Sequence, residues 1–357
     1  MKMTKTRVIK IRPQNPDLDV LAEAAAVLRS AKVIGFPTET VYGIGALYRF
    51  PEAVERVYEI KGRDRNKPLT FHIANFSFLN RMKFKNERVF RYLARKFWPG
   101  PLTLIIADES GKTFGFRMPN HPVARVLIEL CGDPLLATSA NLSGNTSPVT
   151  PDQVLAELDG KIELLIDSGK CALEKESTIV DLVETPFKIV REGAQVHEIK
   201  KVLDEVNAGK LPKFRVLFVC TGNTCRSPMA EAWLKHQIKK DQIDNKIEVD
   251  SCGVFAYKNM PATQEVTLVL KEDGIDASRH LAKPLSLELA KEADQIYAMT
   301  SEHERFILQG FPYFSGKVKV LDIMDPIGME LSVYRSCYKE IKEKMAEELK
   351  WLKERCS

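Results

Sequence analysis

One run of residues constrains the fold of this 357-residue chain more than any other. The apolar stretch Phe214 to Val219 predicts a buried strand, and it leads directly into Cys220-Thr-Gly-Asn-Thr-Cys-Arg-Ser-Pro228. Gly222 and Asn223 tolerate the left-handed backbone that a tight loop needs, and Pro228 suits the first turn of a helix. The run therefore predicts a strand, a loop and a helix in immediate succession, with inward amides that favour an anion.

The side chains of this loop suit phosphoryl transfer through a cysteine. A thiol in the positive field of the loop is favoured as a thiolate, so Cys220 is expected to be the nucleophile, assisted by a hydrogen bond from Ser227. The guanidinium of Arg226 can hold two phosphoryl oxygens at once. The expected phosphate loop also contains Thr221, Gly222, Asn223, Thr224 and Cys225.

From about Arg215 to the C-terminus the sequence resembles the low-molecular-weight protein phosphatases. This resemblance implies a phosphocysteine intermediate at Cys220 and a distant acid that protonates the leaving group and then activates water, with no cofactor. Asp325, in Asp325-Pro-Ile-Gly328, stands where the family places that acid. Arsenate reductases with the same loop use further cysteines, but no cysteine lies between Cys252 and Cys337.

Thr224 bears on the substrate. Family members that act on phosphotyrosine tend to carry a bulky apolar residue here, whereas protein-arginine phosphatases carry threonine, so the resemblance favours a phosphoprotein with phosphoarginine. A small polar side chain leaves room for a guanidinium and loses contact with an aryl ring. Phosphotyrosine remains the alternative. Cys225 is either a structural thiol or a partner for a protective disulfide with Cys220.

The first 200 residues alternate between helical and strand-like patterns. A cap-like Asn15-Pro-Asp predicts a helix to about Ser30, and the following apolar run Val33 to Phe36 predicts a strand. The same patterns predict an α/β domain with a mixed sheet. Further helices are expected at 51–60, 86–97, 121–130 and 151–158, and further strands at 69–73, 102–107, 135–138, 163–166, 177–183 and 187–190.

The chain is expected to form two domains. A polar, helix-like stretch, Glu198 to Val206, and the turn-rich residues 207–212 precede the fresh strand at Phe214. We therefore place one domain at 1–200, a linker at 201–213 and a second domain at 214–357. The second alternates strands and helices as in a doubly wound parallel sheet, with helices at 228–239, 263–272 and 333–354 and strands at 247–250 and 295–299.

Three polar segments of the first domain suit a polyphosphate, although the domain has no Walker loop. They are Pro37-Thr-Glu-Thr-Val-Tyr-Gly-Ile-Gly45, the cationic Lys61-Gly-Arg-Asp-Arg-Asn-Lys67, and Ala137-Thr-Ser-Ala-Asn-Leu-Ser-Gly144. Lysine and arginine neutralise phosphate oxygens, while hydroxyl and amide groups satisfy the remaining oxygens. The three segments together predict an anion-binding cavity.

In this order the segments resemble the YrdC-like threonylcarbamoyl-AMP synthases, over roughly residues 8 to 195. The resemblance implies that threonine, bicarbonate and ATP, with Mg²⁺, give threonylcarbamoyl-AMP and pyrophosphate. The adenylate would pass to a threonylcarbamoyl transferase complex that modifies tRNA. By the resemblance, ATP contacts Lys61, Arg63, Ser139, Asn141, Ser147 and Arg191, and threonine contacts Thr38, His72, Arg117 and Ser177.

Composition narrows the remaining possibilities. The formal net charge of +5 suits anionic ligands but is too small to demand nucleic acid. A module that binds double-stranded RNA or tRNA without synthase chemistry is the rival for the first domain. The seven scattered cysteines argue against disulfides and a protein-held zinc site. With no apolar run of membrane length, we expect a soluble, cytoplasmic bifunctional enzyme.

Overall fold

The computed structural model describes residues 5–356 and divides the chain into two compact units, Met1–Lys210 and Leu211–Ser357. Helix α6 (Val196–Asn207) belongs to the first unit, because its apolar spacing buries Ile199, Val202, Leu203 and Val206. The side chain of Asn207 also exchanges hydrogen bonds with the backbone of Phe187. Much of the segment 201–213, expected to be a linker, is therefore helical and packed, and the irregular connection is confined to 208–213.

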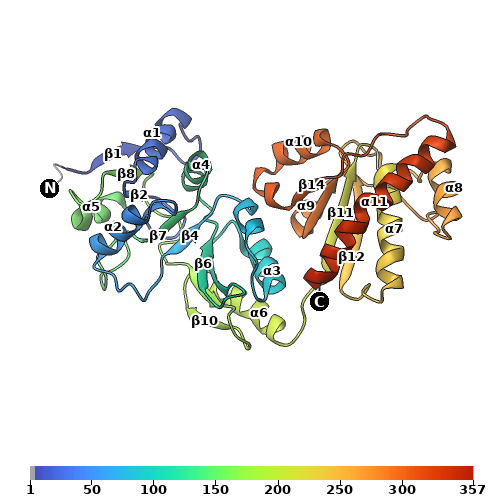
Figure 1. Cartoon of the computed structure of the whole chain (residues 1–357). Helices are drawn as coiled ribbons and strands as arrows, with labels where there is room; N and C mark the ends of the chain where they lie inside the picture. The colour runs from blue at the N-terminus through green and yellow to red at the C-terminus, as the bar shows by residue number, and fades with distance from the viewer. Residues whose placement is uncertain (1–4, 357) are drawn as a thin grey trace. The chain divides into compact units, whose positions relative to one another are not determined.

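The first unit is built on one ten-stranded sheet (Figure 1). The sheet is mixed, as the sequence predicts. Its strand order is β1-β8-β2-β3-β7-β4-β6-β5-β9-β10. The sequence patterns missed β3, because two glycines interrupt its apolar pattern, and also β1 and β6. The strands are β1 (Arg7–Lys10), β2 (Ile34–Phe36), β3 (Gly43–Leu47), β4 (Thr70–His72), β5 (Leu102–Ala107), β6 (Thr113–Arg117), β7 (Leu135–Ser139), β8 (Leu164–Asp167), β9 (Thr178–Asp181) and β10 (Lys188–Arg191).

Helices cover both faces of this sheet. Strand β3 separates two cores, since Leu47 packs with α1 and α4 whereas Ile44 and Ala46 pack with α2 and α5. Helix α1 begins after Asp17, the last residue of the expected cap, because the Asp17 carboxylate accepts the backbone N–H groups of the first turn. The helices are α1 (Leu18–Arg29), α2 (Pro51–Lys61), α3 (Glu87–Phe97), α4 (Pro122–Cys131), α5 (Pro151–Leu158) and α6, with a 3₁₀ turn at Ser77–Arg81.

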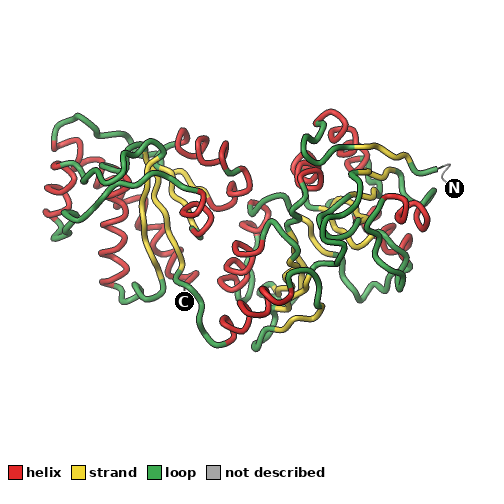
Figure 2. The backbone as a smooth tube through the Cα atoms, turned by 180° about the vertical axis from the view of Figure 1, so that it is seen from behind, coloured by secondary structure: helices red, strands yellow, loops and turns green. Residues whose placement is uncertain are grey.

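The second unit has four parallel strands in the order β12-β11-β13-β14, with helices on both faces (Figure 2). Alternate residues of β11 enter opposite cores: Val216 and Phe218 pack against α7 and α11, and Leu217 and Val219 pack on the other face. The strands are β11 (Phe214–Cys220), β12 (Ile247–Gly253), β13 (Gln295–Ala298) and β14 (Val318–Val320). The helices are α7 (Arg226–Lys240), α8 (Gln264–Glu272), α9 (Leu287–Glu292), α10 (Ser301–Gly310) and α11 (Leu331–Cys356), with a 3₁₀ helix at Pro312–Lys317.

No helix within residues 5–356 combines the length and apolar character needed to cross a membrane.

Candidate active sites

A cavity of about 720 Å³ opens in the first unit. Five cationic side chains and two carboxylates line it, so it suits an anion of nucleotide size. The three polar segments of the sequence contribute to its wall, as do strands β6, β9 and β10. The cavity brings together all ten side chains expected to contact ATP or threonine: Thr38, Lys61, Arg63, His72, Arg117, Ser139, Asn141, Ser147, Ser177 and Arg191.

Lys61 is the last residue of α2, where Gly62 takes the left-handed backbone (φ 59°) that ends the helix. Its buried ammonium donates hydrogen bonds to the backbone oxygens of Ser139 at 2.8 Å and Asn141 at 2.7 Å, and to Asn141 Oδ1 at 3.0 Å. Burial, followed by repulsion from Arg63, lowers the pKa of Lys61 to about 8. The contacts join the α2 terminus to the end of β7 and hold a positive charge at the cavity wall.

Arg117, at the end of β6, is buried in the cavity wall, where two neighbouring side chains hold its guanidinium in place. Its Nη2 donates to Thr40 Oγ1 at 2.8 Å and lies 2.8 Å from Glu39 Oε1 as an ion pair without hydrogen-bond alignment. Both glutamate oxygens are otherwise unpartnered in the part of the chain that the structure describes. Glu39 therefore compensates the arginine charge without lining the cavity itself.

Ser177 and Arg191 meet where β9 pairs with β10. Arg191 Nη2 donates to Ser177 Oγ at 2.9 Å, and its Nε donates to the Ser177 backbone oxygen at 3.0 Å. Glu176 accepts a hydrogen bond from Ser147 and forms an ion pair with Arg191 at 2.8 Å. Burial lowers the pKa of Arg191. The Glu176 carboxylate thus contacts Ser147 and Arg191, two side chains that were expected to bind ATP.

Thr38 and His72 lie in the wall with partners of their own. The Thr38 hydroxyl donates to the Val41 backbone oxygen at 2.6 Å and accepts backbone N–H groups in the same turn. His72 Nδ1 lies 3.1 Å from the Thr70 backbone oxygen, so Nδ1 carries the proton. Burial lowers the pKa of His72 to about 3, so its ring is neutral and Nε2 is left as an acceptor.

Sequence reasoning missed the two glutamates of this site. Glu39 lies within the first of the three polar segments, and Glu176 directly precedes Ser177, which was expected to contact threonine. Neither glutamate has its ion-pair partner close to it in the chain. Glu39 lies 78 positions from Arg117 in the chain, and only the folded structure brings the two together. The signal available was a carboxylate next to a hydroxyl that was expected to contact threonine.

The phosphate loop of the second unit forms as the sequence predicts, between β11 and α7. Cys220 Sγ lies 3.0 Å from Ser227 Oγ and accepts the backbone N–H of Asn223 at 3.2 Å. Of the two residues that tolerate a left-handed backbone, Asn223 adopts it (φ 57°) and Gly222 does not.

The Asn223 side chain fixes the loop from within. Its amide donates to Ser227 Oγ at 3.0 Å and to Ser251 Oγ at 2.7 Å, and its carbonyl accepts the Lys283 backbone N–H at 2.9 Å. The loop also packs tightly on the end of β12, where a Cβ on Gly253 would lie 2.4 Å from the Thr221 backbone oxygen. The loop is therefore held in one shape before any ligand binds.

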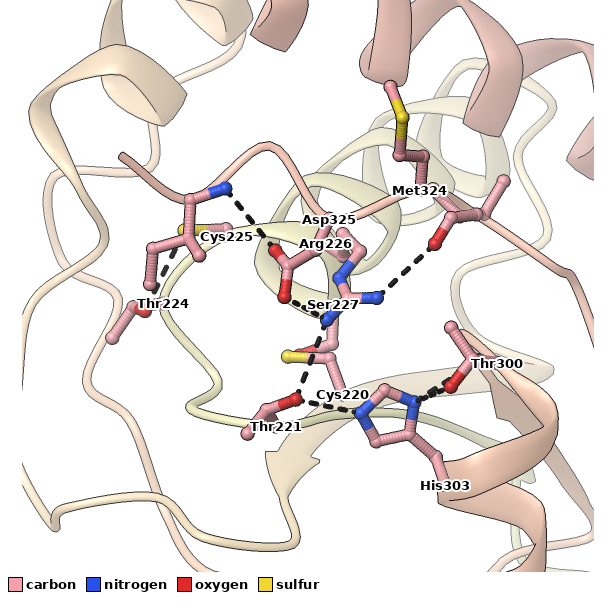
Figure 3. Close-up of polar contacts among 12 residues, drawn as sticks. Cys220, Thr221, Thr224, Cys225, Arg226, Ser227, Thr300, His303, Met324 and Asp325 are labelled. Carbon is pink, nitrogen blue, oxygen red and sulfur yellow. Dashed lines mark hydrogen bonds and ion pairs between the residues drawn. The ribbon is translucent and has the colours of Figure 1, made fainter. Parts of the chain in front are cut away.

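Arg226 and Asp325 meet over the loop although they lie 99 positions apart in the chain (Figure 3). The two side chains form an ion pair; that of Arg226 is 4% exposed and that of Asp325 is 39% exposed. Arg226 also donates to the Ile323 backbone oxygen at 3.2 Å. The expected acid is thus carried on the segment that leads into α11, with one face open to solvent.

Thr224 and Cys225 complete the expected loop. Thr224 is partly exposed, and its Oγ1 lies 3.7 Å from Cys225 Sγ. Cys225 is buried, with its Sγ 3.6 Å from Tyr334 Oη. Burial raises the pKa of the Cys225 thiol, which is the behaviour of a structural thiol.

Sequence reasoning also missed His303, which lies beside the loop (Figure 3). Its Nε2 lies 2.9 Å from Thr221 Oγ1, and its Nδ1 accepts the Thr300 backbone N–H at 3.1 Å. His303 is buried and starts α10 as part of a capping box. No sequence signal placed it there, because α10 itself had not been predicted.

Comparisons with known proteins match the two units separately. The family model described as telomere recombination (Sua5, YciO and YrdC) matches residues 26–193, and the model for low molecular weight phosphotyrosine protein phosphatase matches residues 215–357. The chain therefore joins a Sua5/YciO/YrdC domain to a low-molecular-weight phosphatase domain, and it belongs to both families.

Named relatives match the first unit. The threonylcarbamoyl-AMP synthase of Pyrococcus abyssi is 41% identical over 193 residues, which are 51% of this chain and 57% of that protein. A putative threonylcarbamoyl-AMP synthase of Methanocaldococcus jannaschii is 34% identical, over 53% of this chain and 94% of that protein. The crystal structure of P. abyssi Sua5 complexed with L-threonine has a TM-score of 0.53 at 25% identity, over 96% of this chain and 98% of that one. The chain spans little more than half the length of the P. abyssi synthase and of two further threonylcarbamoyl-AMP synthases that it matches.

Proposed function

We propose that the first unit is an L-threonylcarbamoyladenylate synthase. It would convert threonine, bicarbonate and ATP into threonylcarbamoyl-AMP and pyrophosphate, and the adenylate would be consumed by a tRNA-modifying threonylcarbamoyl transferase complex. One observation carries the proposal: ten side chains from separate segments line a single cationic cavity. The synthase names of the relatives and the threonine in the P. abyssi Sua5 crystal support it.

The chemistry asks mainly for positioning and charge neutralisation. Bicarbonate supplies carbon dioxide, and the amine of threonine captures it and gives up a proton, so that a carbamate forms and one water is released. A carbamate oxygen then attacks the α-phosphorus of ATP as pyrophosphate leaves. Arg117 can pair with the threonine carboxylate, because its guanidinium is already held in place by Glu39 and Thr40. Lys61 and Arg191, which line the same cavity, can neutralise phosphate oxygens.

Magnesium fits this cavity as a companion of ATP. Among residues 5–356, no group of three or more His, Cys, Asp or Glu side chains is placed to hold a metal ion. The cavity does offer the carboxylates of Asp64 and Glu176. Mg²⁺ is ordinarily held by one or two carboxylates together with substrate phosphates, and when bound it would neutralise phosphate charge.

The test is pyrophosphate release by the whole chain with ATP, Mg²⁺, bicarbonate and threonine, with threonine omitted as the control. We expect release that requires threonine and bicarbonate, and that Lys61→Ala abolishes. No release at saturating substrates, together with strongly salt-dependent RNA binding, would overturn the proposal and favour the RNA-binding rival.

We propose further that the second unit is a cysteine-dependent protein phosphatase that prefers phosphoarginine. Cys220 would attack phosphorus while Asp325 protonates the departing nitrogen or oxygen, and Asp325 would then take a proton from the water that hydrolyses the phosphocysteine. The Ser227 contact at 3.0 Å and the Asp325–Arg226 ion pair support these roles. The preference for phosphoarginine rests on Thr224; phosphotyrosine is the alternative.

Cys220→Ser should remove phosphatase turnover and leave pyrophosphate release intact, and Lys61→Ala should do the reverse, because the two sets of side chains lie in separate units. Matched peptides with phosphoarginine and phosphotyrosine decide the substrate. A clear preference for phosphotyrosine would defeat the inference from Thr224, and turnover by Cys220→Ser would show that another residue is the nucleophile.

A further inference from the structure

We propose that Thr221 is a substrate-binding residue of the phosphatase unit, whose hydroxyl donates a hydrogen bond to a phosphoryl oxygen because His303 fixes its orientation. The inference rests on the proposed phosphatase function; it gives the side chain of Thr221 a role and adds His303 to the site. Thr221 directly follows the nucleophile Cys220 in the loop.

The tautomer of His303 follows from its partners. A backbone N–H can only donate, so the contact from Thr300 N at 3.1 Å requires Nδ1 to be an acceptor. Thr300 Oγ1 lies on the same nitrogen at 2.7 Å. Burial, and then repulsion from Arg226, lowers the pKa of His303 to about 4, in agreement with a neutral ring. The ring proton is therefore on Nε2, which faces Thr221.

The hydroxyl of Thr221 is consequently an acceptor in both of its contacts. His303 Nε2 donates to it at 2.9 Å, and Arg226 Nη2 approaches it at 3.5 Å. A hydroxyl oxygen has two acceptor positions and one proton. With both acceptor positions directed at donors, the proton is directed elsewhere, and an anion is the partner that suits it.

The position of the Thr221 hydroxyl indicates which anion it binds: a phosphoryl oxygen of the substrate. Figure 3 shows Thr221 Oγ1 between the His303 imidazole and the Arg226 guanidinium, beside the Cys220 side chain. Thr221 is exposed, whereas Asn223, Arg226 and Ser227 of the same loop are buried. A dianion held by Arg226 over the Cys220 sulfur would therefore be within reach of the Thr221 proton, and the bond would be strengthened by the negative charge.

The test compares Thr221→Val with Thr221→Ser in the whole chain. Inorganic phosphate is used as a competitive inhibitor. Because it carries no leaving group, its inhibition constant reports only on how the site binds the phosphoryl oxygens. Loss of a hydrogen bond to a charged group should weaken phosphate inhibition by about ten-fold or more in the valine variant. The serine variant should stay within about two-fold of the wild type, because it keeps the hydroxyl.

His303 is tested by a second pair of variants. His303→Gln keeps an amide N–H for Thr221 and an oxygen for the Thr300 N–H, so phosphate inhibition should be retained. His303→Leu keeps neither, so inhibition should weaken even where the melting temperature shows a folded protein. Unchanged phosphate inhibition in Thr221→Val would overturn the inference. A wild type that neither turns over phosphopeptides nor binds phosphate would instead overturn the proposed phosphatase.

Discussion

Glu176 and Arg191 form an ion pair at 2.8 Å inside the wall of the cationic cavity of the first unit, and Glu176 also accepts a hydrogen bond from Ser147. Arg191 and Ser147 are two of the residues expected to bind ATP. The carboxylate of Glu176 therefore competes with phosphate oxygens for the same donors, and binding of a polyphosphate must displace or share it.

Removing this competitor should strengthen polyphosphate binding. Glu176→Gln keeps the shape of the side chain and removes its charge. In the absence of magnesium we expect pyrophosphate to bind about two- to five-fold more tightly, a small effect because Arg191 and Glu176 are both about one-third exposed. Isothermal calorimetry checks it, with Glu174→Gln as the control on an exposed ion pair with Lys170. Weaker binding by Glu176→Gln would show that Glu176 assists phosphate rather than competing with it.

ATP affinity should fall in alkaline solution because of Lys61. Its pKa is lowered to about 8, below the ordinary value of 10.5, so Lys61 loses its charge as the pH rises through about 8. If the charged form binds phosphate, affinity at pH 9 should be about ten-fold lower than at pH 7. Lys61→Arg stays charged, so its profile should be flat over the same range. A flat profile for the wild type would show that Lys61 acts without its charge.

Local features of both sites could be predicted from the sequence, because their residues are close in the chain. Cys220 and Ser227 are 7 positions apart and meet across one loop, so strand, loop and helix followed directly from the residue pattern. Asp325 is 99 positions from Arg226, and only the family resemblance pointed to it.

The partners that hold these residues could not be predicted in the same way. Glu39 and Arg117 form an ion pair although β7 and β4 separate β3 from β6 in the sheet, and residue spacing carries no information about such a contact. His303 lies at the start of a helix that the pattern did not predict. Second partners of this kind depend on tertiary packing, so a sequence pattern indicates the reacting groups more readily than the groups that orient them.

The buried pair of Glu39 and Arg117 should be important for stability. Their side chains are 8% and 6% exposed, so Glu39→Gln leaves a buried guanidinium without its counter-charge. We expect a loss on the order of 3 kcal/mol, or roughly 6–12 °C in the melting temperature of the first unit. Calorimetry separates the units, because inorganic phosphate should raise the melting temperature of the second unit, which has the phosphate loop, more than that of the first unit. Glu23→Gln, which breaks an exposed pair with Arg7, should cost less than about 0.5 kcal/mol.

Thr224 should set the choice between phosphoarginine and phosphotyrosine. The residue is partly exposed in the phosphate loop, and its backbone oxygen accepts the Thr263 N–H at 3.0 Å, so the loop has a fixed position in which a larger side chain can be compared with threonine. Thr224→Ile would add apolar contact for an aryl ring and narrow the space for a guanidinium. The ratio of kcat/KM for phosphotyrosine over phosphoarginine peptides should rise by about ten-fold or more.

Thr267→Ile is the matched control for this variant, because Thr267 is a partly buried threonine of α8 whose hydroxyl contacts the Thr263 backbone oxygen rather than the phosphate loop. It should leave the ratio of the two substrates unchanged. If Thr224→Ile lowers both activities equally, the residue supports the loop without reading the substrate. If only the ratio changes while phosphate inhibition stays constant, the side chain at position 224 discriminates between leaving groups, because phosphate itself carries none.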